Sequence, residues 1–391
     1  MTNVDDSRAH PVLPDIDALV IGGGVVGCCL AGFLAEEGVK VGVVDDGRIG
    51  GSNANAGSLH VQLQSRFMRL YPRNVPGMVR QLPLYSRGVA FWQALQTHLG
   101  ADFDLKKTGG LMVAETGDQL EFLKSKAEIE RTMGLDARIL DRADLDRIAP
   151  YLGRAVVGAE LCADEGKLNP LLCNAAIRNW ILQKGVTLLE GETAGRIASE
   201  RGGFAVATER GVVRARRVAL AAGFGSKALA AALGAIIPAE AEPLHMNITE
   251  AAAPLISHLV QHAERMITLK QFGAGQIVIG GGWPAHLAGE RRHPTVELAS
   301  LIGNVTLAQH IVPCIAPLRI LRTWAGINTT VDGRGVLGPI GGVPGLYSAI
   351  PGDAGYTLGP LSARIVADLM LDRPPMVDVA DFSPDRFAKV A

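Results

Sequence analysis

The sequence is poor in aromatic residues, in cysteine and in excess charge of either sign, and each shortage narrows the possible classes of protein. Aromatic residues make up 5% of the 391 residues, and the formal net charge is −1. Such a balance gives no nucleic-acid footprint and no basic patch for an anionic membrane. The five cysteines, Cys28, Cys29, Cys162, Cys173 and Cys314, form no CxxC pair. The sequence therefore encodes neither a zinc site nor an iron–sulfur cluster, and we expect no metal.

The sequence also lacks a signal sequence, and it has no long apolar run without glycine. The first fourteen residues are acidic and polar rather than basic and then apolar. The run from Ala18 to Leu34 is apolar but contains five glycines, so we interpret it as a buried strand, turn and helix rather than a membrane span. The odd, scattered cysteines fit a reducing compartment. We expect a cytoplasmic protein with no integral membrane span.

A glycine turn between two short apolar runs near the N-terminus is the most informative feature present. Gly22 permits the tight turn, Gly24 lets the backbone approach a pyrophosphate, and Gly27 lets the following helix pack against the strand. Asp45 lies eighteen residues after Gly27, close to the position of the acid that binds ribose hydroxyls. The pattern predicts a dinucleotide site, open at this point to NAD as well as FAD.

Segments typical of a nucleotide fold recur in the middle of the chain, at 218–225, and near its end, at 345–349. Between 237 and 317 short segments of alternating character indicate a separate, mainly antiparallel sheet. We interpret 352–360 as a glycine turn. Helices are predicted at 82–99, 119–133, 142–148, 171–184 and 361–371.

The chain resembles the glycine/D-amino-acid oxidase family of FAD-dependent oxidoreductases. The resemblance is carried by GGGVVG at 22–27, Asp45, GS at 51–52, NAG at 55–57, EGKLNP at 165–170, AAG at 221–223, RTWAG at 322–326 and the turn at 352–360. A narrower similarity, to the B subunits of bacterial opine (octopine or nopaline) oxidases and related heteromeric amine dehydrogenases, is carried by the segments NANAGSLHVQL and DEGKLNP.

The resemblance implies an α/β fold in which a Rossmann-like FAD-binding domain, of the glutathione-reductase and D-amino-acid-oxidase type, is interleaved with a mainly antiparallel substrate domain. The FAD-binding domain would comprise 15–100, 150–235 and 320–391, and the substrate-binding domain 101–149 and 236–319.

The resemblance also implies an extended FAD, bound noncovalently because no cysteine lies at 324–328. The glycine turn would face the pyrophosphate, the C-terminal turn would face the electron-rich edge of the flavin, and the remaining residues would line the adenosine, ribityl chain and ring. The implied FAD ligands are Gly22, Gly24, Val25, Val26, Gly27, Asp45, Asp46, Arg48, Gly51, Ser52, Asn55, Ala56, Gly57, Thr193, Ala194, Ala222, Gly223, Trp324, Gly326, Gly352, Asp353, Gly355, Tyr356 and Thr357.

The implied reaction is oxidation of a C–N bond beside a carboxylate, with hydride transfer to flavin N5 and hydrolysis of the resulting imine. The substrate carboxylate needs a cation or a hydroxyl. Arg66, Arg69, Lys270 and Tyr356 are eligible, and the sequence does not choose among them. His60, on the loop after NAG, is a further catalytic candidate, while His245, Trp283 and Trp324 fall in segments expected near the substrate.

Three hypotheses remain open at this stage. The first is the catalytic subunit of a heteromeric opine oxidase, with a partner A subunit that carries further redox cofactors and with room for an FMN at the subunit interface. The second is a stand-alone glycine, D-amino-acid, sarcosine or proline oxidase that produces hydrogen peroxide. The third is a flavin-binding protein retained for assembly. The sequence leaves the substrate, the electron acceptor and the oligomeric state open.

Overall fold

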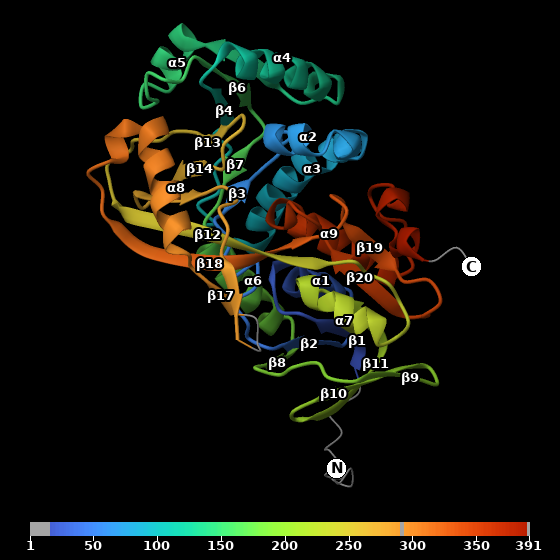
Figure 1. The fold of residues 1–391 in the computed structure, drawn as a ribbon. Coiled ribbons are helices and arrows are strands. Elements are labelled where there is room, and N and C mark those ends of the chain that lie inside the picture. The colour runs from blue at the N-terminus through green and yellow to red at the C-terminus, as the bar shows by residue number, and fades with distance from the viewer. Residues whose placement is uncertain (1–15, 290–292, 389–391) are drawn as a thin grey trace.

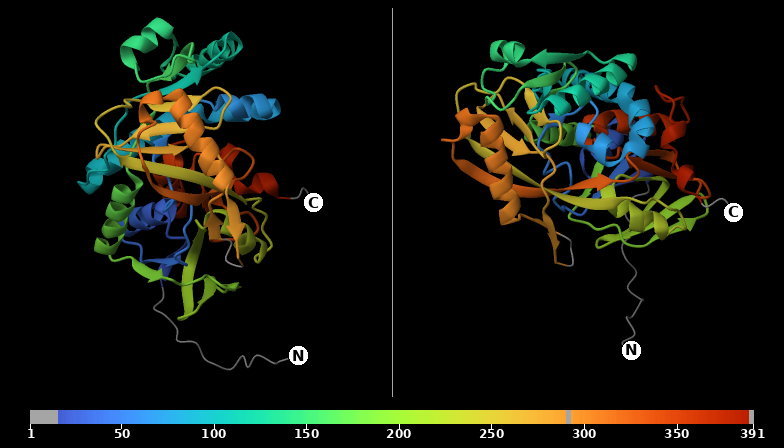
Figure 2. Two further views of the ribbon diagram at one scale, coloured as in Figure 1. Left: turned by 60° about the vertical axis from the view of Figure 1, so that its left-hand side comes forward. Right: turned by 45° about the horizontal axis from the view of Figure 1, so that its top comes forward.

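Two eight-stranded sheets organise the structure, one in the lower and one in the upper part of Figure 1. The computed structural model describes residues 16–289 and 293–388, so the N-terminal segment without a signal pattern lies outside the described residues. Chain segments from the beginning, middle and end meet in the lower sheet, which confirms an α/β fold with interleaved segments (Figures 1 and 2).

The first sheet is a mainly parallel nucleotide-type sheet with the order β19-β20-β11-β1-β2-β8. Alternate residues of β1 face opposite sides: Ala18 and Val20 join one apolar cluster, and Leu19 and Ile21 join another. The strand is continuously apolar because both faces of the sheet are covered. Its strands are β1 (Ile16–Ile21), β2 (Val41–Asp45), β8 (Thr187–Glu190), β11 (Gly211–Leu220), β20 (Leu346–Ile350) and β19 (Val336–Pro339), with β10 (Gly203–Thr208) and β9 (Ile197–Glu200) as an antiparallel extension.

Helices from three parts of the chain pack together on one side of this sheet. They are α1 (Val25–Glu36), α3 (Val75–Leu99), α6 (Pro170–Gln183) and α9 (Gly355–Met370). The smaller helix α7 (Ser226–Ala231) follows η2 (Gly223–Gly225) and contributes Ala230 to the opposite cluster.

The second sheet has the order β18-β12-β15-β14-β13-β4-β6-β5 and is mainly antiparallel. Its strands are β18 (Ile320–Thr330), β12 (Glu240–Ala251), β15 (Gln276–Gly280), β14 (Thr268–Gln271), β13 (Leu259–His262), β4 (Gly110–Ala114), β6 (Gly158–Cys162) and β5 (Ala137–Asp141). Side chains from α5 (Arg142–Ile148) and α8 (Leu298–Ile311) share an apolar cluster with one face of this sheet. On the other face α4 (Gly117–Thr132) contacts β4 and β6, and the remainder of that face contacts the loops of the first domain.

The remaining elements are short. They are β3 (Ser58–Leu59) paired with β7 (Gly166–Lys167), β16 (His286–Ala288) paired with β17 (His293–Thr295), α2 (Ser65–Leu70), and the 3-10 turns η1 (Pro72–Asn74), η3 (Pro313–Ile315), η4 (Ala380–Phe382) and η5 (Pro384–Phe387). Across residues 16–289 and 293–388, no helix combines the length and the apolar character needed to cross a membrane.

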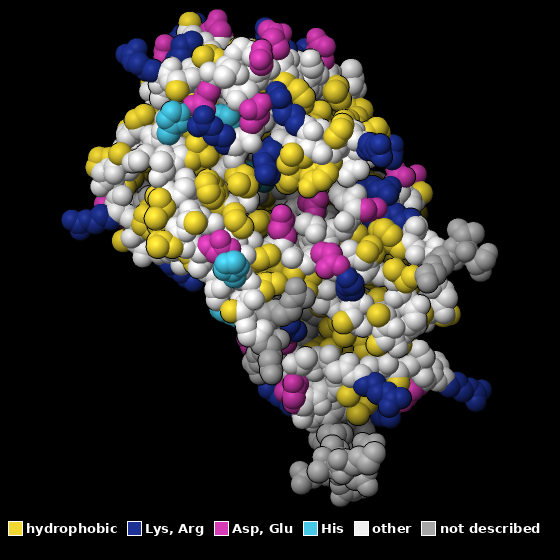
Figure 3. Space-filling view, in the orientation of Figure 1, with side chains coloured by type: hydrophobic (Ala, Val, Ile, Leu, Met, Phe, Trp, Pro, Cys, Tyr) yellow, Lys and Arg dark blue, Asp and Glu magenta, His cyan; other side chains and the backbone are white. Residues whose placement is uncertain are grey.

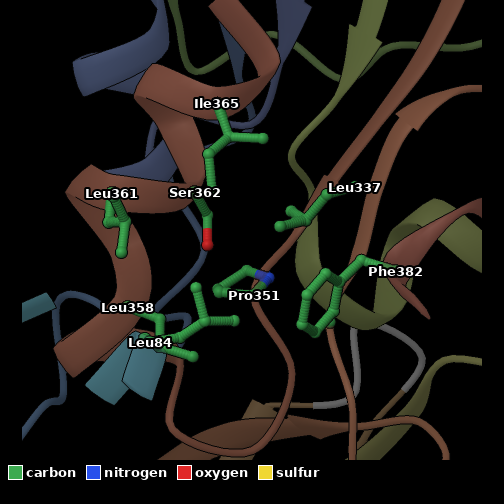
Figure 4. A pocket seen from close by; sticks show the side chains of 9 residues that line it. Leu84, Leu337, Pro351, Leu358, Leu361, Ser362, Ile365 and Phe382 are labelled. Atoms are coloured by element: carbon green, nitrogen blue, oxygen red, sulfur yellow. The ribbon is translucent and has the colours of Figure 1, made fainter. Parts of the chain in front are cut away.

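The C-terminal segment closes over the first domain through apolar contacts. Leu84 of α3, Leu337 of β19, Leu358 of α9 and Phe382 of η4 converge around a small cavity of about 10 Å³ (Figure 4). A cavity of this size leaves room for about one water at most, so the segment after α9 is packed as part of the domain.

The structure corrects several predicted boundaries. Strands β6 and β18 belong to the second sheet, although 150–235 and 320–391 are predicted as nucleotide-domain segments. Helix α9 begins at Gly355, so the predicted turn at 352–360 is mostly helical. Helix α3 begins at residue 75 rather than 82, and α2 forms where we predict only a loop.

Candidate functional site

The turn between β1 and α1 has the geometry of an anion site. Gly22 has a φ of +113°, and a Cβ on Gly27 would lie 1.9 Å from the Gly22 carbonyl oxygen, so α1 reaches this position only with glycine there. Gly24 precedes α1 as its N-cap. Among the described residues, the N–H groups of Val26 and Gly27 have no hydrogen-bond partner. Free N–H groups at a helix N-terminus are what a phosphate binds.

An acidic residue lies against this turn. A Cβ on Gly23 would lie 2.4 Å from Asp45 Oδ2, and the Gly47 N–H donates to Asp45 Oδ1 at 3.2 Å. Burial raises the pKa of Asp45. Asp46 and Arg48, both predicted near the adenine end, form an ion pair with each other at the surface.

The predicted second adenine contact lies beside Asp45. The Glu192 N–H donates to the Asp45 carbonyl oxygen at 3.0 Å, which brings Thr193 and Ala194 to the end of β2. The Thr193 N–H donates to Glu209 at 2.8 Å. These contacts bring 192–194 to the acid although more than 140 residues separate them in sequence.

The end of β11 completes this side of the cradle. The Ala221 N–H donates to the Ile21 carbonyl oxygen at 2.8 Å, so Ala222 and Gly223 lie beside the glycine turn. Gly223 has a φ of +56°.

The loop at 51–57 connects the turn to the second half of the molecule. Ser52 Oγ accepts the Val25 N–H at 2.9 Å, and Asn55 Oδ1 accepts the Gly57 N–H at 2.7 Å. Gly57 has a φ of +77°, and its carbonyl oxygen accepts the Leu168 N–H at 3.0 Å. The NAG motif, with Ala56 at its centre, is thereby tied to EGKLNP.

The same loop lies against β18. Trp324 Nε1–H donates to the Ala54 carbonyl oxygen at 2.9 Å, and a Cβ on Gly326 would lie 2.4 Å from Ala54 Cβ. A Cβ on Gly51 would lie 2.9 Å from the Ile327 carbonyl oxygen. The RTWAG motif therefore needs glycine at position 326, because the loop at 51–57 crosses β18 closely at this point.

The C-terminal turn reaches the same loop from the other side. Gly352 has a φ of +81°, and Gly355 begins α9. Thr357 Oγ1 accepts the backbone N–H of His60 at 3.0 Å. Asp353 is partly exposed as a residue, but protein atoms surround its carboxyl group, and this local burial, followed by the neighbouring carboxylates Glu242 and Asp332, raises its pKa to about 6.

Lys270 lies on the face of the second sheet that meets these loops. Its Nζ donates to Ser58 Oγ at 2.8 Å, and the side chain is completely buried. Burial, with Lys167 nearby, lowers the pKa of Lys270 to about 7. A cation or a neutral amine is thus available at this position near neutral pH.

Arg66 and Arg69, both predicted near the substrate, lie on or beside a surface groove instead. Arg69 pairs with Glu264 at 3.0 Å and lies 4.0 Å above the Phe122 ring. Arg66 lines a groove of about 720 Å³ between α2 and α8, which Figure 3 shows as a hollow with hydrophobic side chains on both sides. The structure brings neither arginine to the loop contacts at Ser58 and Ala54.

Tyr356 packs into the core, which argues against its predicted role as a carboxylate ligand. Its ring stacks on Trp92 with centroids 5.2 Å apart, and its hydroxyl donates to Asn174 Oδ1 at 2.8 Å and contacts Cys173. The side chain is 5% exposed. The backbone of Tyr356 lies in the first turn of α9.

His245 and Trp283 are also displaced from the predicted substrate side. His245 shares the face of β12 that carries Asn247, and Asn247 bonds Asn304 of α8 at 2.9 Å. Trp283 packs its ring on Gly303 of α8. Both side chains therefore face α8, on the side of the sheet opposite Lys270.

Two residues have roles that the sequence did not suggest. Glu165 of EGKLNP is completely buried and accepts hydrogen bonds from the loop at 61–62. Arg322 of RTWAG has no ion-pair or hydrogen-bond partner among the described residues and lies 5.8 Å from the Trp324 ring. Both fall in motifs that we recognised, but only the hydrogen bonds of Glu165 and the strand register of Arg322 reveal what they face.

Comparison with known proteins agrees with this architecture. The profile of the DAO family, described as FAD dependent oxidoreductase, matches residues 17–369. The B subunit of opine oxidase from Agrobacterium tumefaciens (strain Ach5) is 27% identical, with 95% of this chain and 98% of that protein aligned. The beta subunit of sarcosine oxidase from Rhizobium meliloti (strain 1021) is 24% identical, with 96% and 89% aligned. The crystal structure of glycine oxidase from Geobacillus kaustophilus superposes with a TM-score of 0.85, at 24% identity and with 96% and 99% coverage.

The fold and the glycine cradle define an FAD-dependent oxidoreductase. The chain belongs to the DAO family, whose members act on amino acids and amines, and it is an enzyme of that kind. The free N–H groups of Val26 and Gly27 fit the pyrophosphate of FAD.

Proposed function

We propose that the protein oxidises a C–N bond of an opine-like secondary amino acid, such as octopine or nopaline, as the catalytic subunit of a heteromeric enzyme. FAD, bound noncovalently in this proposal, would supply the hydride acceptor N5, and water would hydrolyse the resulting imine to a 2-oxo acid and an amino acid. An A subunit would receive the electrons, and an FMN would fit at the subunit interface. The subunit names of the two relatives described above support a partner.

One row of side chains across the second sheet carries the proposal. Lys270 is paired with Val278, Val278 with Ile248, and Ile248 with Arg322. Directly paired residues share a face of a sheet. A buried lysine and an exposed arginine thus end a row whose centre is apolar, on the face that meets the loops at Ser58 and Ala54.

The spacing of this row suits a substrate with two carboxylates. Three strand spacings separate the ends, about 14 Å between Cα atoms. In the proposed complex, the long side chains of Lys270 and Arg322 lean toward the substrate and narrow this gap to the size of a small diacid. An opine carries a carboxylate on each side of its secondary amine, and arginine binds carboxylates in a bidentate manner.

The residues divide the remaining work in this proposal. The first turn of α1 and the Gly352 turn would hold the cofactor, and the positive N-terminal end of α9 would stabilise the negative charge that reduction places on it. Lys270 and Arg322 bind and orient the substrate. The apolar residues Val278 and Ile248 exclude water from the reacting carbon.

The second candidate is a stand-alone oxidase of glycine, D-amino acids, sarcosine or proline that forms hydrogen peroxide. The glycine oxidases among the relatives, at 26% identity for that of Geobacillus kaustophilus, favour it. Five free cysteines support a cytoplasmic location in either case.

An anaerobic titration tests the proposal. The purified, FAD-loaded protein is mixed with octopine, nopaline, sarcosine, glycine, proline and D-amino acids, and the visible flavin absorbance is followed. We expect bleaching by the opines at lower concentration than by any monocarboxylate. Bleaching by glycine or D-amino acids alone, with hydrogen peroxide formed in air at a full turnover rate, would favour the second candidate.

A further inference from the structure

A buried carboxylate organises the loop that carries His60. Glu165 Oε1 accepts the backbone N–H groups of Val61 and Gln62 at 2.8 and 3.2 Å. Glu165 Oε2 accepts the side-chain amides of Gln62 and Gln261, each at 2.8 Å. The loop between β3 and α2 is thus held by four donors to one side chain.

This carboxylate has no cationic partner apart from His60. Within the described part of the chain, no lysine or arginine forms an ion pair with Glu165, and its side chain is completely buried. His60 Nδ1 lies 3.8 Å from Glu165 Oε1. A buried carboxylate without a cation favours a positive charge beside it strongly, because water does not screen the pair.

The His60 ring is oriented for such a charge. Its Nδ1 is buried and has no hydrogen-bond partner, while the side chain as a whole is 30% exposed. The exposed surface therefore lies on the rest of the ring, which carries Nε2. A hydrogen bond to Thr357 holds the backbone of His60, so the ring changes position only by rotation of the side chain.

We propose that His60 and Glu165 form a proton-accepting pair that deprotonates the bound substrate amine, a role that rests on the proposed function. The substrate enters as an ammonium ion, and hydride leaves its carbon only after the nitrogen has regained its lone pair. His60 starts neutral, with its proton on Nδ1 toward Glu165. Nε2 takes one proton from the nitrogen, the N–H bond breaks, and its electron pair returns to the amine. Glu165 is a positioning residue that stabilises the imidazolium so formed.

Other charged groups approach this pair from each neighbouring element. Lys126 Nζ donates to Gln62 Oε1 at 3.2 Å and pairs with Glu130 and Glu160, each at 2.8 Å. Lys270 lies across the β3–β7 ribbon, through Ser58. Lys167, on β7, adds a second buried amine, and its pKa is lowered to about 8 by burial and by Lys106.

The first test does not depend on turnover. Ring ¹⁵N spectra of His60 are recorded in the wild-type holoenzyme and in Glu165→Gln, which keeps the size and removes the charge. We expect the Nδ1–H tautomer of the neutral ring in the wild type and a larger share of the Nε2–H tautomer in the variant. An Nε2–H form in the wild type, or an unchanged ratio of the two tautomers in the variant, would overturn the pair.

The second test uses the pH dependence of anaerobic flavin reduction. The acidic limb of the rate should move to lower pH in E165Q and disappear in His60→Gln, with the FAD content unchanged. Glu36→Gln is the matched control, since Glu36 and His98 form a surface pair at 2.9 Å. Equal pH profiles in wild type and E165Q would contradict the proposal. If no amine reduces the wild-type flavin, the proposed function fails, whereas the ¹⁵N spectra still decide the pair. If E165Q does not fold, Gln261→Met removes one donor to Glu165 and is expected to raise the share of the Nδ1–H tautomer of His60.

Discussion

His60 and Thr357 are 297 residues apart in sequence, and the backbone N–H of His60 donates to Thr357 Oγ1 at 3.0 Å. This bond joins the loop after NAG to the first turn of α9. The two ends of the site, one near the start of the chain and one near its end, are therefore held in a fixed relation. In the proposed arrangement, a substrate contact on the first loop and a cofactor contact on the last helix can act together because of this bond.

Gly27→Ala should abolish FAD binding. The added Cβ would lie 1.9 Å from the Gly22 carbonyl oxygen, so α1 must move away from the turn that holds the pyrophosphate. We expect a destabilisation of about 1–3 kcal/mol as well, typical of overpacking. The ratio of flavin to protein absorbance and the thermal midpoint measure both. Gly77→Ala, inside α3 with open space around it, is the control and should keep its FAD.

Lys270→Met should change how stability depends on pH. The pKa of Lys270 is about 7 in the folded protein against 10.5 as the ordinary value. Between these values the unfolded chain binds a proton that the folded chain does not, so wild-type stability rises with pH by about 1.4 kcal/mol per unit. The variant should lose this slope and be the more stable protein at pH 7. Urea unfolding from pH 7 to 10 measures it, with the exposed Lys124→Met as control. Parallel curves for wild type and Lys270→Met would show that the ammonium is not disfavoured by folding.

Arg322→Met should weaken the binding of substrates with two carboxylates more than the binding of substrates with one. In the proposed substrate arrangement, Arg322 binds the carboxylate that a monocarboxylic amino acid lacks. The concentration of an opine that half-bleaches the flavin should rise by about ten- to a hundredfold, in line with the loss of a charge-assisted pair. The value for sarcosine should change little. Arg319→Met, on the neighbouring exposed segment, is the control. An equal loss for both substrates would assign Arg322 to the fold rather than to specificity.

Asp353→Asn should make the flavin easier to reduce, and more so at alkaline pH. Burial first, and then Glu242 and Asp332, raise the pKa of Asp353 to about 6. In the proposed arrangement the flavin edge lies at this turn, so above this pH the Asp353 carboxylate would oppose the negative charge that reduction places on that edge. The potential of the variant should exceed that of the wild type at pH 8, and the two should converge at pH 5. Asp381→Asn, at the surface in η4, serves as the control. A constant difference across this range would mean that Asp353 does not titrate beside the flavin.

The dinucleotide end of the site could be predicted from the sequence because its determinants are local. Gly22, Gly24, Gly27 and Asp45 lie within one strand–helix–strand unit, and the structure gives them the expected arrangement. The interleaving of two sheets could be predicted as well, since the change from apolar runs to alternating strands is visible in the residues.

The domain boundaries could not be predicted in the same way. β6 and β18 read like other strands, and only their partners β4, β5 and β12 assign them to the second sheet. Strand pairing across such sequence distances is a tertiary property, and no local pattern encodes it.

The start of α9 shows how packing overrides a local signal. The segment GDAGYTLGP reads as a turn, but Pro360 lies inside the helix. A proline leaves the carbonyl four residues earlier without its helical partner. That carbonyl, on Tyr356, accepts Trp92 Nε1–H at 2.8 Å instead. The hydrogen bond from Trp92 of α3 therefore satisfies the carbonyl group that Pro360 leaves without a helical partner, and α9 continues past the proline.

The substrate side was the least predictable part. From the sequence alone, four residues are equally eligible to bind the substrate carboxylate, because each is a cation or a hydroxyl in a suitable segment. They are Lys270, Arg66, Arg69 and Tyr356. The structure separates them by direction: Lys270 meets Ser58, Tyr356 is in the core, and the two arginines lie on or beside a surface groove. Direction depends on sheet register, which a single sequence does not reveal.

A single-turnover experiment tests the central claim most directly. The FAD-loaded protein is reduced without oxygen by one equivalent of octopine, and the products are quantified against the bleached flavin. The account predicts one 2-oxo acid and one free amino acid for each flavin reduced. An unbleached flavin and intact octopine, with a loaded cofactor site, would contradict it.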